Sequence, residues 1–547
     1  MSKLSLIITF TLAAVTAQAQ KINRSALDTT KPQNVTVTSS YKPVLREAAK
    51  INFTAANAPA DTARPKLFYT IPSQNLFFVY DPSPLKPLAL NIDSLIAWQN
   101  HNYLKVGYGN FATPFVQGGV AFGDGNRTVV NIHARHTGSK GKLPYQQFIK
   151  TNLDGIGIFT SKNNVNEITA NAWFDANNQY LYGYRPDTLK ITKDSLKQRF
   201  NSIGARIALR NKNAEQVGYS YMPSLQINNF NDNHDGHETT LKVNLAGSKN
   251  FSRMYGASLA FNADLTNFKT DNRTIKNNLV YIEPTLYFKT PNLKITAGVT
   301  PSWDNSNYKM LPNFVAEAKI KNEKFIAMAG YQGYFNKTTY QSLATFNPFI
   351  AQPTELRTTT IKEAFAGFKG SAGNHFTYNG RLSLLQQTNM PLFVNDTVTG
   401  RYFTVLNETK LRTVAIHGEL GYTVQDKFSL LAGTTLRSFQ NLDIYDKAYG
   451  LIPMEVTAAL RWQVLKDVHF KADAFIWDGP RNRTKSGDTQ KQEAAFDVNT
   501  GVEVGIIKNW SVWLQFNNLL NNKYQRWNQY EVLGFNVLGG VIYSFGK

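Results

Sequence analysis

The sequence predicts an all-β protein, a transmembrane antiparallel β-barrel of about 22 strands with a short extended N-terminal periplasmic arm. Three observations carry this prediction. Apolar and polar residues alternate in many segments after residue 101, short and long connections take turns between them, and the chain ends on a strand with one apolar face. Beyond the N-terminus no run of 18 apolar residues occurs, so the sequence excludes a helical membrane protein.

Residues 1–19 have the pattern of a signal peptide. Lys3 supplies a positive charge, the 14 residues from Leu4 to Ala17 are apolar apart from Ser and Thr, and Ala17-Gln18-Ala19 is a small-x-small cleavage site. Because 14 residues are too few to span a bilayer, we expect a cleaved signal peptide and export rather than a membrane anchor.

Residues 20–100 are predicted to form the periplasmic arm. Eight of the 21 prolines lie between Pro32 and Pro87, and proline removes a backbone donor from a sheet, so regular sheet is excluded here. The segment also contains an apolar cluster from Leu76 to Tyr80, which we expect to leave water by docking in the barrel mouth or against a strand.

Residues 101–547 are predicted to form the barrel. Ile203, Ala205 and Ile207 share one face of a strand whose other face carries Arg206 and Arg210. A register shift of one residue would place those charges in lipid, so the pattern fixes which face points inward.

The connections between these strands fall into two classes. Short turns, such as 161–164 and 290–292, alternate with longer connections, such as 336–357 and 519–534. Outer-membrane barrels have short periplasmic turns and long extracellular loops, whereas a soluble β-sandwich has no reason to sort its loops in this way. Counting strands by this rule gives 22. Counts of 20 or 18 are the alternatives, because the strand bounds are defined only to within several residues and the strand 402–424 could contain a hairpin.

The formal net charge of +21 restricts the partners of the chain. In a soluble protein it would favour nucleic acid, but for an exported barrel we expect no nucleic acid and instead outer-membrane lipid, including lipopolysaccharide, and anionic solutes. An alternative is that the lumen charges pair with acidic residues on neighbouring strands. The candidate lumen charges are Arg206, Arg210, Lys242, Arg461 and Lys471.

The C-terminal region carries a family resemblance. Asn517-Asn518-Leu519-Leu520-Asn521-Asn522-Lys523-Tyr524, followed by Trp527, Tyr530 and Gly540-Val541-Ile542-Tyr543-Ser544-Phe545, resembles the end of a TonB-dependent receptor barrel of the Bacteroidetes type. The resemblance implies location in the outer membrane of a Gram-negative cell and transport of solutes across it. It also implies that Tyr543 and Phe545, on the closing strand, are the signal for the barrel assembly machinery. The chain departs from the family in lacking a recognisable plug domain.

The arm contains a short match to the segment by which such receptors engage TonB. Val35 and Val37 alternate with polar residues in Asn34-Val35-Thr36-Val37-Thr38, and a short β-piece of the arm is the alternative interpretation. The expected partner is therefore TonB, or a separate plug or lid protein. Two functions remain: transport of solutes, and a non-transporting structural or assembly-partner barrel whose lumen is filled.

The sequence offers little for catalysis. It contains no Cys, no Gly-rich phosphate loop and no H-E-x-x-H motif, so we expect neither an enzyme nor a cofactor. The segment from His234 to Glu238 has two imidazoles and two carboxylates that could bind a metal, but a solvated polar loop is the favoured interpretation and no metal site is predicted.

Overall fold

The computed structural model describes residues 102–546 apart from 186–187, 213, 426 and 485–486. The predicted signal peptide (1–19) and arm (20–100), with Val35, Val37 and the cluster from Leu76 to Tyr80, lie outside the described residues. Among the described residues, the structure contains no helix that is long and apolar enough to cross a membrane.

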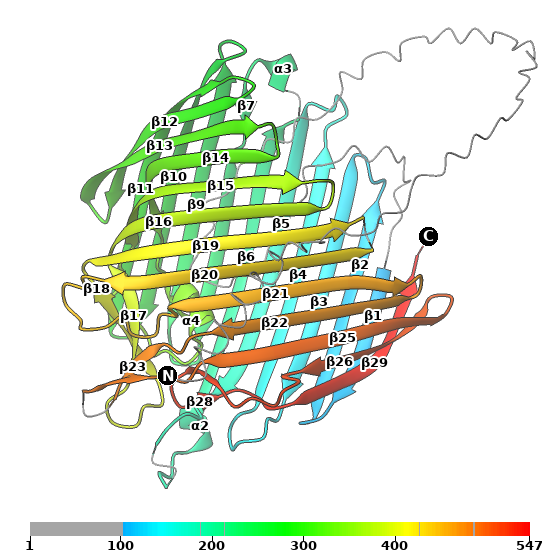
Figure 1. The fold of residues 1–547 in the computed structure, drawn as a ribbon. Coiled ribbons are helices and arrows are strands. Elements are labelled where there is room, and N and C mark those ends of the chain that lie inside the picture. Colours follow the sequence, from blue (N-terminus) through cyan, green and yellow to red (C-terminus); the bar gives the residue numbers. More distant parts are fainter. Residues whose placement is uncertain (1–101, 186–187, 213, 426, 485–486, 547) are drawn as a thin grey trace, which may run out of the picture. The chain divides into compact units, whose positions relative to one another are not determined.

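The described chain forms a closed antiparallel barrel (Figure 1). Its wall consists of β1 (Asn102–Gly109), β2 (Thr113–Gly123), β3 (Thr128–Ser139), β4 (Phe148–Thr160), β5 (Asn166–Tyr180), β6 (Lys197–Asn211), β7 (Ser220–Tyr221), β8 (Ser224–Asp232), β9 (His237–Asn250), β10 (Tyr255–Thr270), β11 (Arg273–Lys289), β12 (Leu293–Asp304), β13 (Asn307–Lys321), β14 (Phe325–Asn336), β15 (Thr359–Ala372), β16 (Phe376–Thr388), β19 (Leu411–Val424), β20 (Phe428–Gln440), β21 (Met454–Leu465), β22 (Val468–Trp477), β25 (Ala495–Ile507), β26 (Trp510–Asn517) and β29 (Asn536–Phe545).

The strand count agrees with the prediction. β7 and β8 both pair with β9, so together they form one interrupted strand of a 22-strand wall. Met222 and Pro223 separate them, and proline has no N–H for the ladder. The barrel closes where the last strand, β29, pairs antiparallel with β1, placing Val541 opposite Val106.

The prediction of a single strand over residues 402–424 is wrong. It divides into β18 (Phe403–Glu408), which pairs with β17 (Met390–Asn395) outside the wall, and the wall strand β19. The division falls beside Glu408, whose buried carboxylate accepts backbone hydrogen bonds from Lys410 (3.3 Å) and from Tyr445 (2.9 Å) in the next loop. These bonds turn the chain away from the wall and leave the count of 22 unchanged.

The remaining elements lie at the two ends of the barrel (Figure 1). One end, the turn end, holds short turns and α3 (Ala214–Val217), and the other, the loop end, holds the long connections. In outer-membrane barrels the turn end is periplasmic and the loop end extracellular. The loop end contains α2 (Lys193–Leu196), α4 (Tyr340–Phe346), β17, β18, β23 (Arg481–Arg483), β24 (Thr489–Lys491), β27 (Gln525–Trp527) and β28 (Tyr530–Glu531).

The outer surface of the wall is apolar, as a lipid-facing surface requires. Ile203, Ile207 and Leu259 are each more than half exposed, although each would be buried in a soluble protein. At the turn end Tyr543 stacks on Phe545, with ring centroids 5.7 Å apart, and contacts Trp510 on β26 at 4.8 Å. Aromatic side chains gather in this way at the rim between membrane and water.

Candidate functional site

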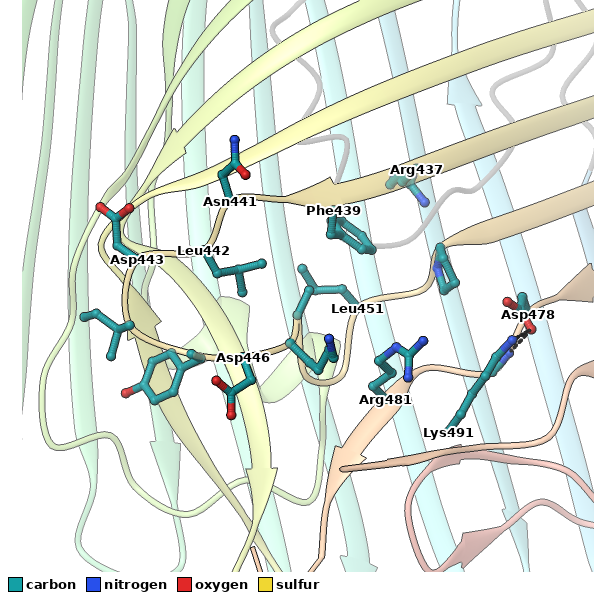
Figure 2. Close-up of a pocket in the computed structure, with 16 residues that line it drawn as sticks. Arg437, Phe439, Asn441, Leu442, Asp443, Asp446, Leu451, Asp478, Arg481 and Lys491 are labelled. Carbon is teal, nitrogen blue, oxygen red and sulfur yellow. Dashed lines mark hydrogen bonds and ion pairs between the residues drawn. The ribbon is translucent and has the colours of Figure 1, made fainter. Parts of the chain in front are cut away.

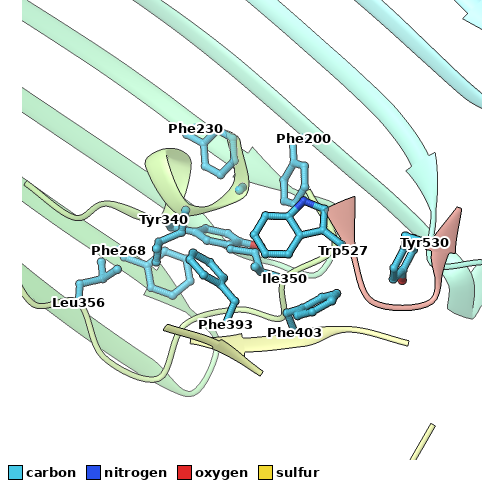
Figure 3. Packing of buried hydrophobic residues seen from close by; sticks show 12 residues of the cluster. Phe200, Phe230, Phe268, Tyr340, Ile350, Leu356, Phe393, Phe403, Trp527 and Tyr530 are labelled. Atoms are coloured by element: carbon cyan, nitrogen blue, oxygen red, sulfur yellow. The ribbon is translucent and has the colours of Figure 1, made fainter. Parts of the chain in front are cut away.

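Three long loops of the loop end fold inward and meet in one aromatic core. They are the connections 337–358 with α4, 389–410 with the hairpin β17–β18, and 518–535 with β27 and β28. Figure 3 shows their side chains packed against the inner wall. The buried core consists of Phe200, Phe230 and Phe268 from the wall and Tyr340, Leu343, Ala344, Ile350, Leu356, Phe393, Phe403, Trp527 and Tyr530 from the loops.

Ring contacts hold the three loops together. Trp527 lies 5.2 Å from Phe393 and 5.3 Å from Phe403, measured between ring centroids, so it joins the third loop to the hairpin. Tyr530 stacks on Phe349 of the α4 loop at 3.6 Å. Contacts of this kind are stabilising beyond the area that they bury, so the loops form a folded unit inside the mouth.

Polar bonds fix α4 to the wall. The carboxylate of Glu238 on β9 accepts the backbone N–H groups of Tyr340 (2.5 Å) and Gln341 (3.0 Å), in the first turn of α4. The hydroxyl of Tyr340 donates to Asp232 on β8 at 2.7 Å, and Gln352 donates to the same carboxylate at 2.9 Å. A negative charge at a helix N-terminus is favourable, and these bonds satisfy donors that would otherwise be buried without partners.

Lys337 anchors the start of the same loop. Its amine donates to the backbone carbonyls of Asp264 (3.1 Å) and Asn277, and lies 3.9 Å from the Asp264 carboxylate. Burial lowers the pKa of Lys337 to about 8, and the nearby Asp264 carboxylate opposes that shift.

A second loop cluster borders a pocket of about 560 Å³ (Figure 2). One side of the pocket is lined by Arg437 and Phe439 of β20, which point inward because they alternate with the outward-facing Leu436. The other sides are lined by residues of the connections 441–453 and 478–494. Lys491 pairs with Asp478 at 2.7 Å. The pocket contains the charged residues Arg437, Asp443, Asp446, Lys447, Asp478, Arg481 and Lys491.

The predicted lumen charges differ in their surroundings. Arg210 pairs with Glu167 at 2.6 Å, Lys242 with Asp264 at 3.1 Å and Arg461 with Asp473 at 2.8 Å. These pairs follow the alternative in which charges neutralise each other across neighbouring strands. Arg206 and Lys471 form no ion pair with any residue that the structure describes.

The candidate metal segment has another role in the structure. Glu238 caps α4, while Asp232, just before the segment, accepts the backbone N–H groups of His234 and Gly236 at 2.8 Å. Among the described residues there is no group of three His, Cys, Asp or Glu side chains placed to hold a metal ion.

Sequence reasoning missed the inward packing of the loops. The available signal was the aromatic content of the long connections, with Phe346 and Phe349 in one and Trp527 and Tyr530 in another. Large apolar side chains in supposedly solvated loops indicate a buried environment, and here the loops bury them against one another.

The fold defines a class: a closed 22-strand transmembrane β-barrel whose long loops fold inward at one end. No protein-family model and no curated protein matches the chain. Solved structures with similar folds include the iron transporter FrpB of Neisseria meningitidis (F3-3 variant), at 12% identity over 82% of each chain with a TM-score of 0.62.

Two further structures have the same architecture. The siderophore receptor PirA of Acinetobacter baumannii is 8% identical over 82% of this chain and 80% of its own, with a TM-score of 0.63. The pyoverdine outer membrane receptor FpvA of Pseudomonas aeruginosa is 10% identical over 82% of this chain and 79% of its own, with a TM-score of 0.61. At these identities the likeness shows the fold.

Proposed function

We propose that the protein is an outer-membrane transport barrel that binds a solute with anionic groups at its loop end and passes it through the lumen. The observation that carries this proposal is the formed pocket beside Arg437, at the mouth of a 22-strand barrel. A barrel of this size encloses a lumen wide enough for a solute. The similar folds of an iron transporter, a siderophore receptor and a pyoverdine receptor make iron chelates the first solutes to test.

The charges of the pocket support an anionic solute. Lys491 is neutralised by Asp478. The other charged residues of the pocket, Arg437, Lys447 and Arg481 against Asp443 and Asp446, form no ion pair with any described residue and leave an excess of one positive charge. Guanidinium groups bind carboxylates and phosphates in bidentate geometry, so two of them at one pocket favour a ligand with such groups.

Uptake by intact cells tests this proposal. Replacing both Arg437 and Arg481 with Gln should lower the accumulation of the transported chelate at least tenfold and leave the amount of folded barrel unchanged. The control is Lys427→Gln, an exposed basic residue in a turn-end connection. Equal uptake by the double variant and the wild type would contradict a role for this pocket.

The energy source is a separate part of the proposal. We infer that TonB supplies it through residues 34–38, where Val35 and Val37 alternate with polar residues. Deleting 34–38 should abolish uptake without changing solute binding, because binding at the loop end needs no energy. Unchanged uptake would favour passive passage or a separate plug or lid protein.

A second candidate is the non-transporting barrel with a filled lumen, and the aromatic core formed by three inward loops favours it. The absence of both solute uptake and ion conductance from the folded, full-length protein would support this candidate.

A further inference from the structure

The outer surface of the barrel carries a polar belt near its loop end, on β5, β6 and β8 to β11, which lie side by side (Figure 1). Phe200, Phe230 and Phe268 point inward onto α4, so the residues on either side of each must point outward. The outward positions of the belt are Asn178, Arg199, Asn201, Asn229, Asn231, His237, Thr239, Asn267, Lys269 and Lys276.

The belt is basic and rich in amide groups. Arg199, Lys269 and Lys276 are exposed and form no ion pair with any residue that the structure describes. The acidic residues at these strand ends do not neutralise the belt: Asp232 and Glu238 are buried and face inward onto α4, and Asp235 and Asp271 lie in the turns beyond the strands. On an outward face this is a positive surface without a partner inside the protein.

Cross-strand bonds hold the belt in a defined geometry. Arg199 donates from Nε to Asn178 at 2.7 Å. This bond leaves the N–H groups on the two terminal nitrogens of its guanidinium available to a ligand. Asn201 donates to Asn231 at 3.2 Å, and Thr239 donates to Asn229 at 2.8 Å. Side chains fixed in this way lose little freedom when a ligand binds.

Below the belt the same side of the barrel is lipid-facing and hollowed. A groove of about 560 Å³ runs over β3 to β8, where Gly155, Gly157, Ala170 and Ala172 leave space beside larger apolar side chains. Ala205 lines the groove and lies six residues from Arg199 along β6, which is about 20 Å of strand. One lipid molecule can therefore place its charged head group in the belt and an acyl chain in the groove.

We propose that this belt binds a phosphorylated glycolipid of the outer leaflet, with its phosphates on Arg199, Lys269 and Lys276. Arginine and lysine are the side chains that bind phosphate, and the asparagine and threonine side chains offer donors and acceptors to sugar hydroxyls. The belt lies between the apolar outer surface of the wall and the loop end, which is where we expect an outer-leaflet head group to meet a barrel, and its positive charge complements the phosphates. The inference is independent of the proposed transport function.

Lipid binding by the full-length protein in mild detergent tests the inference. The probe is a bisphosphorylated, acylated glucosamine disaccharide, titrated beside its dephosphorylated form and quantified by native mass spectrometry. The variant Arg199→Glu/Lys269→Glu/Lys276→Glu should bind the phosphorylated lipid at least tenfold more weakly, and the wild type should prefer the phosphorylated form.

The control variant Lys427→Glu/Lys466→Glu/Lys508→Glu makes the same change of charge in three turn-end connections and should bind as the wild type does. Heat-modifiable migration establishes that each barrel is folded, and a triple Gln variant replaces the Glu variant if that one fails to fold. Equal binding by belt and control variants would overturn the inference. So would equal binding of the dephosphorylated lipid, or complete displacement by inorganic phosphate.

Discussion

Glu238 determines where α4 sits, because its carboxylate receives two backbone N–H groups from the first turn of that helix. The side chain is 1% exposed and belongs to a wall strand, so the helix is tied to the barrel and not only to its own loop. Nothing in the local sequence indicates this role, since His234 to Glu238 reads as a polar loop. The partner of Glu238 is more than a hundred residues away.

We expect Glu238→Ala to detach the α4 loop while the barrel itself stays folded. The substitution leaves two buried N–H groups without acceptors, each of which costs about 1–3 kcal/mol. Protease added to intact cells should cleave within 337–358 in the variant and not in the wild type. Glu323→Ala removes a carboxylate from a turn-end ion pair with Lys319 and should leave this cleavage pattern unchanged.

At the scale of elements, the seam between β1 and β29 has its own small core. Trp513 of β26 is 1% exposed, packs on Phe115 at 5.2 Å and donates from its indole nitrogen to the carbonyl of Val106 at 3.2 Å. Gly107 and Gly540 have no side chain on this inner face, which leaves room for the indole ring across the seam. The seam is thus closed by packing as well as by backbone pairing.

Gly540→Val should weaken the seam. A Cβ at this position would collide with the carbonyl of Val106, and overpacking of this kind costs about 1–3 kcal/mol. The temperature at which the folded band converts to the unfolded band in gel electrophoresis should fall. Gly118→Val on β2 places its Cβ no closer than 3.5 Å to a neighbour and should convert at the wild-type temperature. Identical temperatures for both variants would contradict a packed seam.

At the scale of the whole molecule, the barrel could be predicted from the sequence and the site could not. Ile203, Ala205 and Ile207 alternate with Arg206, as expected for a strand with one face in lipid. The positions of the strands, the direction of their side chains and the number of strands could therefore be predicted from local pattern. The α4 helix has seven residues, too few for a helical period to emerge. Its position depends on contacts with β8, β9 and two other loops, which no local pattern encodes.

The same architecture leads to a prediction about permeability. The α4 loop lies inside the mouth of the barrel. It contacts the loop 518–535 through Trp527 and Tyr530, and the β17–β18 loop through Phe393 (Figure 3). Replacing 338–357 with a short Gly-Ser linker removes that segment and exposes the inner wall around Phe268. Single-channel conductance in a planar bilayer should rise above that of the wild type. If the arm also enters the lumen, conductance should rise further when residues 21–90 are deleted as well. Unchanged conductance in the loop variant and in the double deletion would mean that other parts of the chain block the lumen, and would favour the filled, non-transporting barrel.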